Sequence, residues 1–257
     1  MKASATGDGV RIGAVDKSLQ VLEILKERDG GTIAELTEEL EWPKSTVYAH
    51  VRTLEENEYI VNEDGEYYLG FQLLNLGGYV QNRKEVYKVI EPKVNALAEK
   101  TGERVQFVIE EYGNAVYVQI AEGEGAVSTG GRIGQRRPML HATAAGKSIL
   151  AHIPESRVDE IIERQGLPEF TVNTITDREN LEEELEEIRE RGYAINNEER
   201  IIGMRALGAP INHPVDDTIG TISIAGPAHR IQGELVSELS DQVMAVQNEI
   251  ELDIQYG

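Results

Sequence analysis

Two helical patterns and one alternating pattern follow each other in the first third of the chain. Residues 32–42 form a short apolar repeat, and residues 43–59 form a second one after a turn. In the second segment Val47, Val51 and Leu54 recur at the spacing that places side chains on one buried helix face. These spacings predict two short helices that pack against each other.

The alternating pattern covers residues 59–70 and is centred on Asp64-Gly65. An Asp-Gly pair between alternating strands is typical of a tight β-hairpin. An earlier helix is expected at about 14–28, with four apolar residues facing inward: Val15, Leu19, Leu22 and Leu25. Residues 12–70 therefore predict a winged helix-turn-helix, a shape that places one helix in a DNA groove.

The second helix carries the candidate DNA-contacting side. Its residues away from the buried face are mostly small, hydroxyl-bearing or basic, and such groups approach bases and phosphates without desolvating a carboxylate. The candidate DNA-binding residues are Lys44, Ser45, Thr46, Tyr48, Ala49, Arg52 and Thr53. No acidic residue occurs between Glu41 and Glu55, although the chain as a whole is strongly acidic. The alternative interpretation is an ordinary surface helix.

A further helical stretch at 71–90 follows the hairpin, with Gly77-Gly78 interrupting its apolar run. We interpret it as a linker helix that also joins two protomers, the alternative being a plain connector. A second domain is expected over 91–257. Its strands are predicted at 104–111, 115–121, 194–199, 205–211 and 218–225, and its later helices at 142–153, 155–165, 177–191 and 231–254. The mixture predicts an α+β fold with an antiparallel sheet.

The net charge of −21 conflicts with DNA binding, because basic side chains normally meet the phosphates. Residues 1–90 contain 10 Lys and Arg against 16 Asp and Glu, whereas residues 91–257 contain 15 against 30. Most of the acid excess therefore lies outside the predicted DNA-binding part. We interpret this excess as adaptation to high intracellular salt in a halophilic archaeon, where charge repulsion is screened within a few ångströms.

Cysteine is absent, which excludes disulfides and thiolate metal sites. No run of about 18 apolar residues occurs, and the first residues lack the apolar core of a signal peptide. We therefore expect a cytoplasmic protein that does not associate with membranes. The five histidines show no metal-ligand spacing, and no Gly-x-Ser-x-Gly elbow occurs. No catalytic residue, metal or cofactor is predicted.

The second domain contains a Gly146-Lys147-Ser148 sequence like the end of a phosphate-binding P-loop. That motif needs a glycine five residues earlier, where His141 stands, and a buried strand before it. A different role fits better, because small residues around Ala144 and Ala145 would let a ligand reach backbone N–H groups at a helix start. Such a position suits a carboxylate or another anion.

Three later strands supply the other candidate ligand contacts. Alternating residues along neighbouring strands point to the same face of a sheet. Asn196, Ala206, Ser223 and Ala225 could therefore line one small cavity. Each of them alone is compatible with a purely structural role.

In sequence order, the chain resembles the IclR family of transcriptional regulators from about residue 12 to 230. The segments that carry the resemblance are VDKSLQVLEIL, WPKSTVYAHVRTLEENEYI, YYLGFQLLNLG, GQRRPMLHATAAGKSILA, TITDRENLEEELEEIRERGYAINNEE, MRALGAPI and TISIAGPAHRI. The resemblance implies a winged helix-turn-helix, a linker helix and a GAF-like effector-binding domain. It also implies a homodimer or homotetramer on double-stranded operator DNA, controlled by a small-molecule effector that we expect to be an organic or sugar acid.

By this resemblance the effector-binding residues are Ala144, Ala145, Asn196, Ala206, Ser223 and Ala225. The chain departs from the acid-binding members of the family at four of these positions. Asn196 replaces an acidic residue, and alanines at 144, 206 and 225 replace glycine, cysteine and serine. The position of the pocket therefore carries over better than the identity of the ligand. Two other functions stay open at this point: an enzyme using the second domain, and a winged-helix module that binds proteins.

Overall fold

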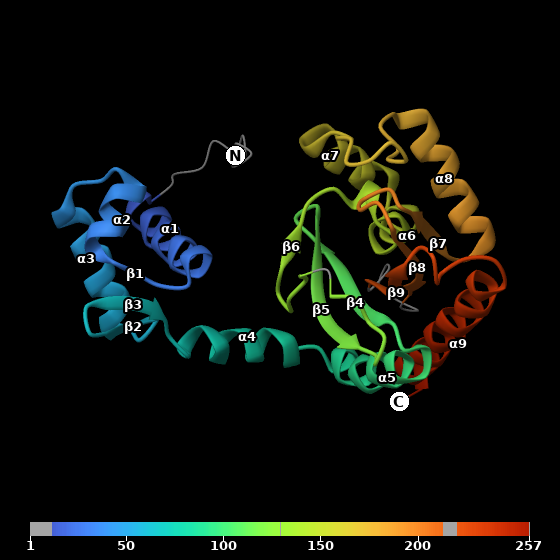
Figure 1. Ribbon diagram of the computed structural model, residues 1–257, viewed down its shortest axis with the longest axis horizontal. Coiled ribbons are helices and arrows are strands. Elements are labelled where there is room, and N and C mark those ends of the chain that lie inside the picture. The colour runs from blue at the N-terminus through green and yellow to red at the C-terminus, as the bar shows by residue number, and fades with distance from the viewer. Residues whose placement is uncertain (1–11, 129, 213–219, 257) are drawn as a thin grey trace. The chain divides into compact units, whose positions relative to one another are not determined.

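The computed structural model describes residues 12–128, 130–212 and 220–256. By internal contacts the chain forms two compact units that divide between Arg83 and Lys84. Figure 1 shows the elements of both. The division falls inside the 71–90 segment, so that each unit receives part of the predicted linker. Within the described ranges, no helix is both long and apolar enough to cross a membrane.

The N-terminal unit begins with a three-helix arrangement and a small sheet. Its elements are α1 (Gly13–Arg28), β1 (Gly31–Thr32), α2 (Ile33–Leu40), α3 (Lys44–Glu56), β2 (Ile60–Glu63) and β3 (Glu66–Leu69). The strands pair antiparallel in the order β1-β3-β2. This is a winged helix-turn-helix, and the predicted fold of this region is confirmed.

Local sequence explains the boundaries of these elements. Thr32 caps α2 by accepting a hydrogen bond from the Glu35 backbone, while the Glu35 side chain bonds back to the Thr32 N–H. Asp64 and Gly65 both have positive φ, at 54° and 96°, as a two-residue turn with the twist of the strands requires. The hairpin that forms the wing therefore follows directly from its Asp-Gly pair.

The core of the N-terminal unit corrects one prediction. Val21 and Leu25 are the buried residues of α1, whereas Val15 and Leu19 are each 54% exposed and do not face inward. Helix α1 has two apolar stripes, and the stripe that contains Val21 packs into the core. The core residues are Val21, Leu25, Leu36, Val47, Val51, Leu54, Ile60 and Tyr67.

The single helical stretch predicted at 71–90 is two helices. Helix α4 (Gln72–Asn82) continues through Gly77-Gly78, and α5 (Glu85–Thr101) begins after the extended backbone of Lys84. The first helix of the C-terminal unit therefore starts before residue 91. Within α4 no residue is buried, and five large apolar side chains at 71–80 are exposed: Phe71, Leu74, Leu76, Tyr79 and Val80.

The C-terminal unit is built on a six-stranded antiparallel sheet of order β6-β5-β4-β9-β8-β7. Its strands are β4 (Arg104–Glu111), β5 (Asn114–Glu122), β6 (Arg136–Arg137), β7 (Ala194–Asn197), β8 (Met204–Ile211) and β9 (Gly220–Pro227). Its later helices are the 3-10 turn η1 (Leu140–Ala142), α6 (Ala144–His152), α7 (Glu155–Gln165), α8 (Arg178–Arg191) and α9 (Glu234–Tyr256). The predicted antiparallel α+β fold is confirmed; residues 218 and 219 of the last predicted strand lie outside the described residues.

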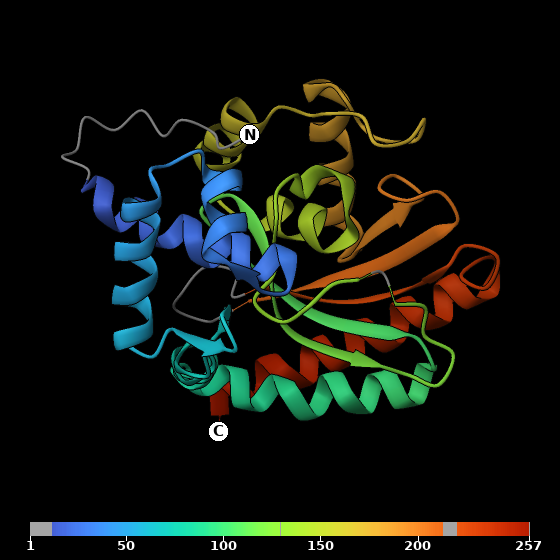
Figure 2. The ribbon, with the colours of Figure 1, turned by 60° about the vertical axis from the view of Figure 1, so that its left-hand side comes forward.

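Helices cover both faces of this sheet, as Figures 1 and 2 show for α5 and α9 on one face and α6 on the other. Alternate residues of β9 face opposite sides of the sheet. Ile222 and Ile224 join the core under α5 and α9, and Ser223 points to the α6 face. The second core combines α6, α7 and α8. The polar residues of the strands thus gather under the start of α6.

Candidate functional site

The exposed side of α3 contains the predicted DNA-binding residues. Lys44, Ser45, Tyr48, Ala49, Arg52 and Thr53 are exposed, and Thr46 is half-buried. Tyr48 is 54% exposed. The structure thus brings all seven residues onto one helix.

Acidic groups nevertheless reach the edge of this surface. The Arg52 guanidinium lies 2.9 Å from a Glu56 carboxylate oxygen and 3.6 Å from Glu55, all on α3. In the wing, Asp64 and Glu66 are exposed near the turn. Arg52 must exchange its carboxylate partners for any DNA contact, and the wing tip carries charge of the same sign as phosphate.

The predicted effector-binding residues come together around one pocket in the C-terminal unit. All six of them line it: Ala144, Ala145, Asn196, Ala206, Ser223 and Ala225. The pocket has a volume of about 80 Å³. It is also lined by residues that the sequence did not single out: Gln106, Tyr117, Arg137, Thr143, Arg200, Ile201, Met204 and Arg205. Four of these, Arg137, Thr143, Met204 and Arg205, lie in segments that carry the family resemblance, whereas Gln106, Tyr117, Arg200 and Ile201 lie outside those segments.

Strand register explains the floor of the pocket. Asn196 on β7 pairs with Ala206 on β8, which pairs with Ala225 on β9, so the three form one row across the sheet. Ser223 pairs with Gln106 in the next row on the same face. The alanines leave the space that larger side chains would fill. The amide of Asn196 is committed to the wall, because its Nδ2 donates to the Ala142 carbonyl at 2.5 Å.

The start of α6 forms the opposite wall. The Thr143 side chain caps the helix by accepting from the Gly146 N–H at 3.0 Å, which leaves the N–H groups of Ala144 and Ala145 at the open end. A Cβ on Gly146 would lie 2.1 Å from the Leu140 carbonyl oxygen, so only glycine lets η1 pack this closely. The helix terminus is a favourable position for a negative charge.

The charge of the lining supports an anionic ligand. Arg137, Arg200 and Arg205 line the pocket, and no acidic side chain occurs among the described residues that line it. Burial, together with repulsion from Arg137, lowers the pKa of Arg200 from its ordinary value. The described lining of the pocket therefore carries positive charge and no negative charge.

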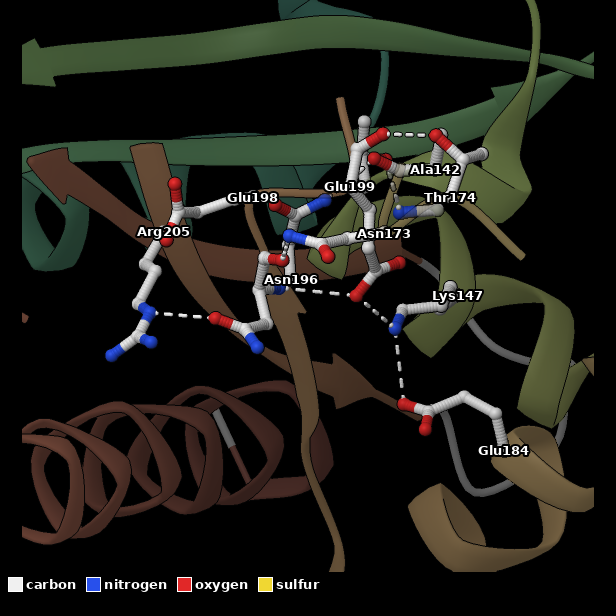
Figure 3. A network of polar contacts seen from close by, with 12 residues as sticks. Ala142, Lys147, Asn173, Thr174, Glu184, Asn196, Glu198, Glu199 and Arg205 are labelled. Carbon is white, nitrogen blue, oxygen red and sulfur yellow. Dashed lines mark hydrogen bonds and ion pairs between the residues drawn. The ribbon is translucent and has the colours of Figure 1, made fainter. Parts of the chain in front are cut away.

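The contacts of Lys147 in the Gly-Lys-Ser sequence argue against a phosphate-binding role. It is 1% exposed and donates to Glu199 at 2.8 Å and Glu184 at 3.1 Å, as Figure 3 shows. Thr174 donates to the Glu199 backbone carbonyl at 2.6 Å. These contacts fix the turn after β7, which carries Arg200 into the pocket.

The buried His141 and the half-buried His50 both make contacts of a structural kind. His141 is buried, with its Nε2 3.1 Å from the Pro168 carbonyl oxygen, and burial lowers its pKa. His50 lies 2.9 Å from the Ser18 hydroxyl on α1 and packs against Trp42. In the described ranges no group of three His, Asp or Glu side chains gathers as a metal site.

Comparison with known proteins identifies both units. Residues 14–64 match the IclR helix-turn-helix domain, and residues 78–252 match the bacterial transcriptional regulator IclR C-terminal domain. The chain is 32% identical to the probable HTH-type transcriptional regulator ArcR of Halobacterium salinarum, over 99% of this chain and 98% of that protein. It is 29% identical to the HTH-type transcriptional repressor AllR of Escherichia coli, over 90% and 88% of the two chains.

Solved structures agree with the sequence matches. The crystal structure of the Thermotoga maritima IclR superposes with a TM-score of 0.81 at 31% identity, covering 96% of this chain and 100% of that one. These matches are to regulators rather than enzymes. The chain therefore belongs to the IclR family of transcriptional regulators, with a helix-turn-helix DNA-binding domain followed by a C-terminal effector-binding domain.

Proposed function

We propose that the protein binds operator DNA through the exposed side of α3. A small organic acid bound in the 80 Å³ pocket changes the affinity for that DNA. The observation that carries the proposal is the pocket itself: six alanine, serine and asparagine positions, an open helix start and, within the described ranges, no acidic lining residue. By analogy with AllR, which is named a repressor, we propose repression as the direction of control.

The size of the pocket supports a small ligand. One water-sized sphere needs about 10–15 Å³ of such volume, so this pocket holds roughly five to eight of them. Organic acids of that many heavy atoms fit, whereas drug-sized ligands need about 300 Å³ or more. The ligand carboxylate would accept hydrogen bonds from the Ala144 and Ala145 backbone N–H groups.

The test is operator binding by the full chain in buffered KCl, measured by fluorescence anisotropy with and without added acids. Short organic acids should shift the operator Kd. Ala206→Leu fills the pocket floor and should abolish that shift while leaving DNA affinity unchanged. Ala245→Leu, at an exposed position on α9, is the control for added volume. If Ala206→Leu responds to acids as the wild type does, the effector binds elsewhere.

We also propose that two protomers join through α1 and α4. Both helices expose apolar residues that a monomer leaves in water, among them Leu19 and Leu74. Large exposed apolar patches are typical of interaction sites. A dimer would present two α3 helices to the two half-sites of an operator.

A further inference from the structure

Three arginines line the effector pocket, and none of the described residues that line it is acidic, in a protein with 46 Asp and Glu residues. One of the three is committed to the walls. Arg205 donates from Nε to the Asn197 side-chain oxygen at 2.7 Å and from a terminal nitrogen to the Ile231 carbonyl at 3.1 Å. Arg200 is the main candidate for ligand binding, and Arg137 lines the same pocket.

Arg200 is held by a ring rather than by a carboxylate. Its guanidinium carbon lies 3.8 Å from the centroid of Phe170. Among the described residues the guanidinium has no hydrogen-bond or ion-pair partner. Stacking on an aromatic face orients a guanidinium while leaving the donors at its edge available. Arg200 thus presents hydrogen-bond donors to a pocket that it lines.

Arg137 lies near enough to oppose the charge of Arg200. Repulsion from Arg137 contributes to the lowered pKa of Arg200, and the Arg137 guanidinium is itself placed over the Tyr117 ring at 5.6 Å. Two guanidinium groups that repel each other beside one cavity are stabilised by a bound anion. The start of α6 already provides a separate place for one acidic group.

The backbone around Arg200 is anchored on the preceding residue. Glu199 is tied by its side chain to Lys147 and by its carbonyl to Thr174. Its carboxylate oxygen Oε1 also accepts from the Asn197 backbone N–H at 3.1 Å. Arg200 is therefore held on a turn that both α6 and the 171–174 segment fasten, as a preorganised ligand group requires.

We infer that Arg200, assisted by Arg137, binds a second acidic group of the effector, so that the pocket selects short dicarboxylates over monocarboxylates. The inference rests on the proposed function, since it names the ligand class of the same pocket. One carboxylate takes the Ala144 and Ala145 N–H groups, and the other takes the guanidinium edge. A three- or four-carbon dicarboxylate, with roughly seven or eight heavy atoms, matches the volume estimated from water-sized spheres.

Calorimetric titration of the full chain tests this with malonate and succinate against acetate and propionate. Ionic strength and chloride concentration are held equal, because surface charge effects vary with both. The wild type should bind the better dicarboxylate at least about ten-fold more tightly than the matched monocarboxylate, as one added charge-assisted contact implies. Arg200→Gln should remove that ratio and change monocarboxylate affinity by less than about three-fold.

Three further variants sharpen the result. Arg200→Lys keeps the charge and should retain part of the preference, and Arg137→Gln should reduce it. Arg136→Gln is the matched control, since Arg136 is the exposed neighbour on β6, paired with Glu111 at 2.5 Å. It should leave the preference unchanged. Monocarboxylate binding in each variant reports that the pocket is still folded.

The outcomes separate this inference from the proposed function. Equal binding of both classes, or an unchanged preference in Arg200→Gln, overturns the dicarboxylate assignment but leaves an acid-binding pocket. If neither class binds and no acid alters operator affinity, both the assignment and the proposed effector class are wrong. An equal loss of preference in Arg136→Gln and Arg200→Gln also overturns the assignment, because it indicates general charge rather than a contact.

Discussion

The ammonium of Lys147 lies 2.8 Å from a carboxylate oxygen of Glu199, across two elements that both border the effector pocket. Lys147 belongs to α6, and Glu199 to the turn that carries Arg200. Both side chains are buried, at 2% and 7% exposure. A second carboxylate, that of Glu184 on α8, lies 3.1 Å from the same ammonium and also accepts from Arg191 at 2.9 Å. The buried cluster therefore fixes the mouth of the pocket to the helix beside it.

Lys147→Ala should lower the free energy of unfolding by about 3–5 kcal/mol, because it leaves the buried Glu199 carboxylate without its cation. The measurement is urea unfolding of the full chain at fixed KCl. Lys93→Ala is the matched control: Lys93 pairs with Glu249 at 2.9 Å and Asp253 at 3.2 Å but is more accessible. It should cost about 1 kcal/mol or less. Equal losses of unfolding free energy in the two variants would mean that burial of the Lys147 ion pair does not increase its contribution to stability.

Arg52→Ala should weaken operator binding by about 1–3 kcal/mol if Arg52 reads a base. The low end is expected, because Arg52 must first leave Glu55 and Glu56. Anisotropy at matched salt is the measurement. Arg28→Ala removes an exposed arginine of α1 that pairs with Glu35 and Glu39, and serves as the control. Unchanged affinity in Arg52→Ala would remove this residue from the DNA surface.

Acidification should destabilise the wild type relative to His141→Gln. Burial lowers the pKa of folded His141 below its ordinary value of about 6.5. The unfolded chain then binds the proton more readily, so this contribution is complete above about pH 6.5 and is lost as pH falls towards the folded pKa. The limiting slope is about 1.4 kcal/mol per pH unit. Urea unfolding at pH 7.5 and 5.5 measures it, with His229→Gln at an exposed position as the control. If the free energy of unfolding changed with pH in the wild type as it does in His141→Gln, His141 would not be a source of the pH dependence.

Raising KCl from dilute buffer to molar concentration should increase the melting temperature, because the net charge of −21 repels itself less when screened. Replacing Glu183, Glu186 and Glu190 with Gln removes three exposed charges of α8. This triple variant should depend less on KCl than the wild type. Highest stability in dilute buffer would rule out adaptation to salt.

Leu74→Glu should convert an assembled protein into single chains, because it places a charge in the apolar side of α4 that we propose as an interface. Sedimentation velocity measures the change in mass. Asn75→Glu introduces the same charge at the neighbouring exposed position and should leave the mass unchanged. A wild-type chain that sediments as a monomer at micromolar concentration would exclude the interface.

Local patterns predicted the elements of the fold well, and they failed where two patterns competed. The spacing of Val47, Val51 and Leu54 identified the buried face of α3, and the Asp64-Gly65 pair identified the hairpin. In α1 the spacing of Val15 and Leu19 was equally regular, but the core uses Val21. Only packing against α3 and β3 decides between two apolar stripes on one helix.

The residues of the pocket also divide into those that local patterns predicted and those that they did not. Period-two alternation and family resemblance brought forward Asn196, Ala206, Ser223 and Ala225, and strand pairing places them on one face. Arg200 was not predicted as a pocket residue, because its position depends on a turn held by Lys147 and Thr174, which are distant in sequence.

The sequence by itself determined most of the secondary structure, the segment between Glu41 and Glu55 without acidic residues and the small residues of the pocket, because periodicity and turn chemistry act between near neighbours. The tertiary structure alone decided which apolar stripe is buried, where the linker breaks and which arginines line the pocket. Those outcomes depend on contacts between segments far apart in the chain, which no local pattern contains.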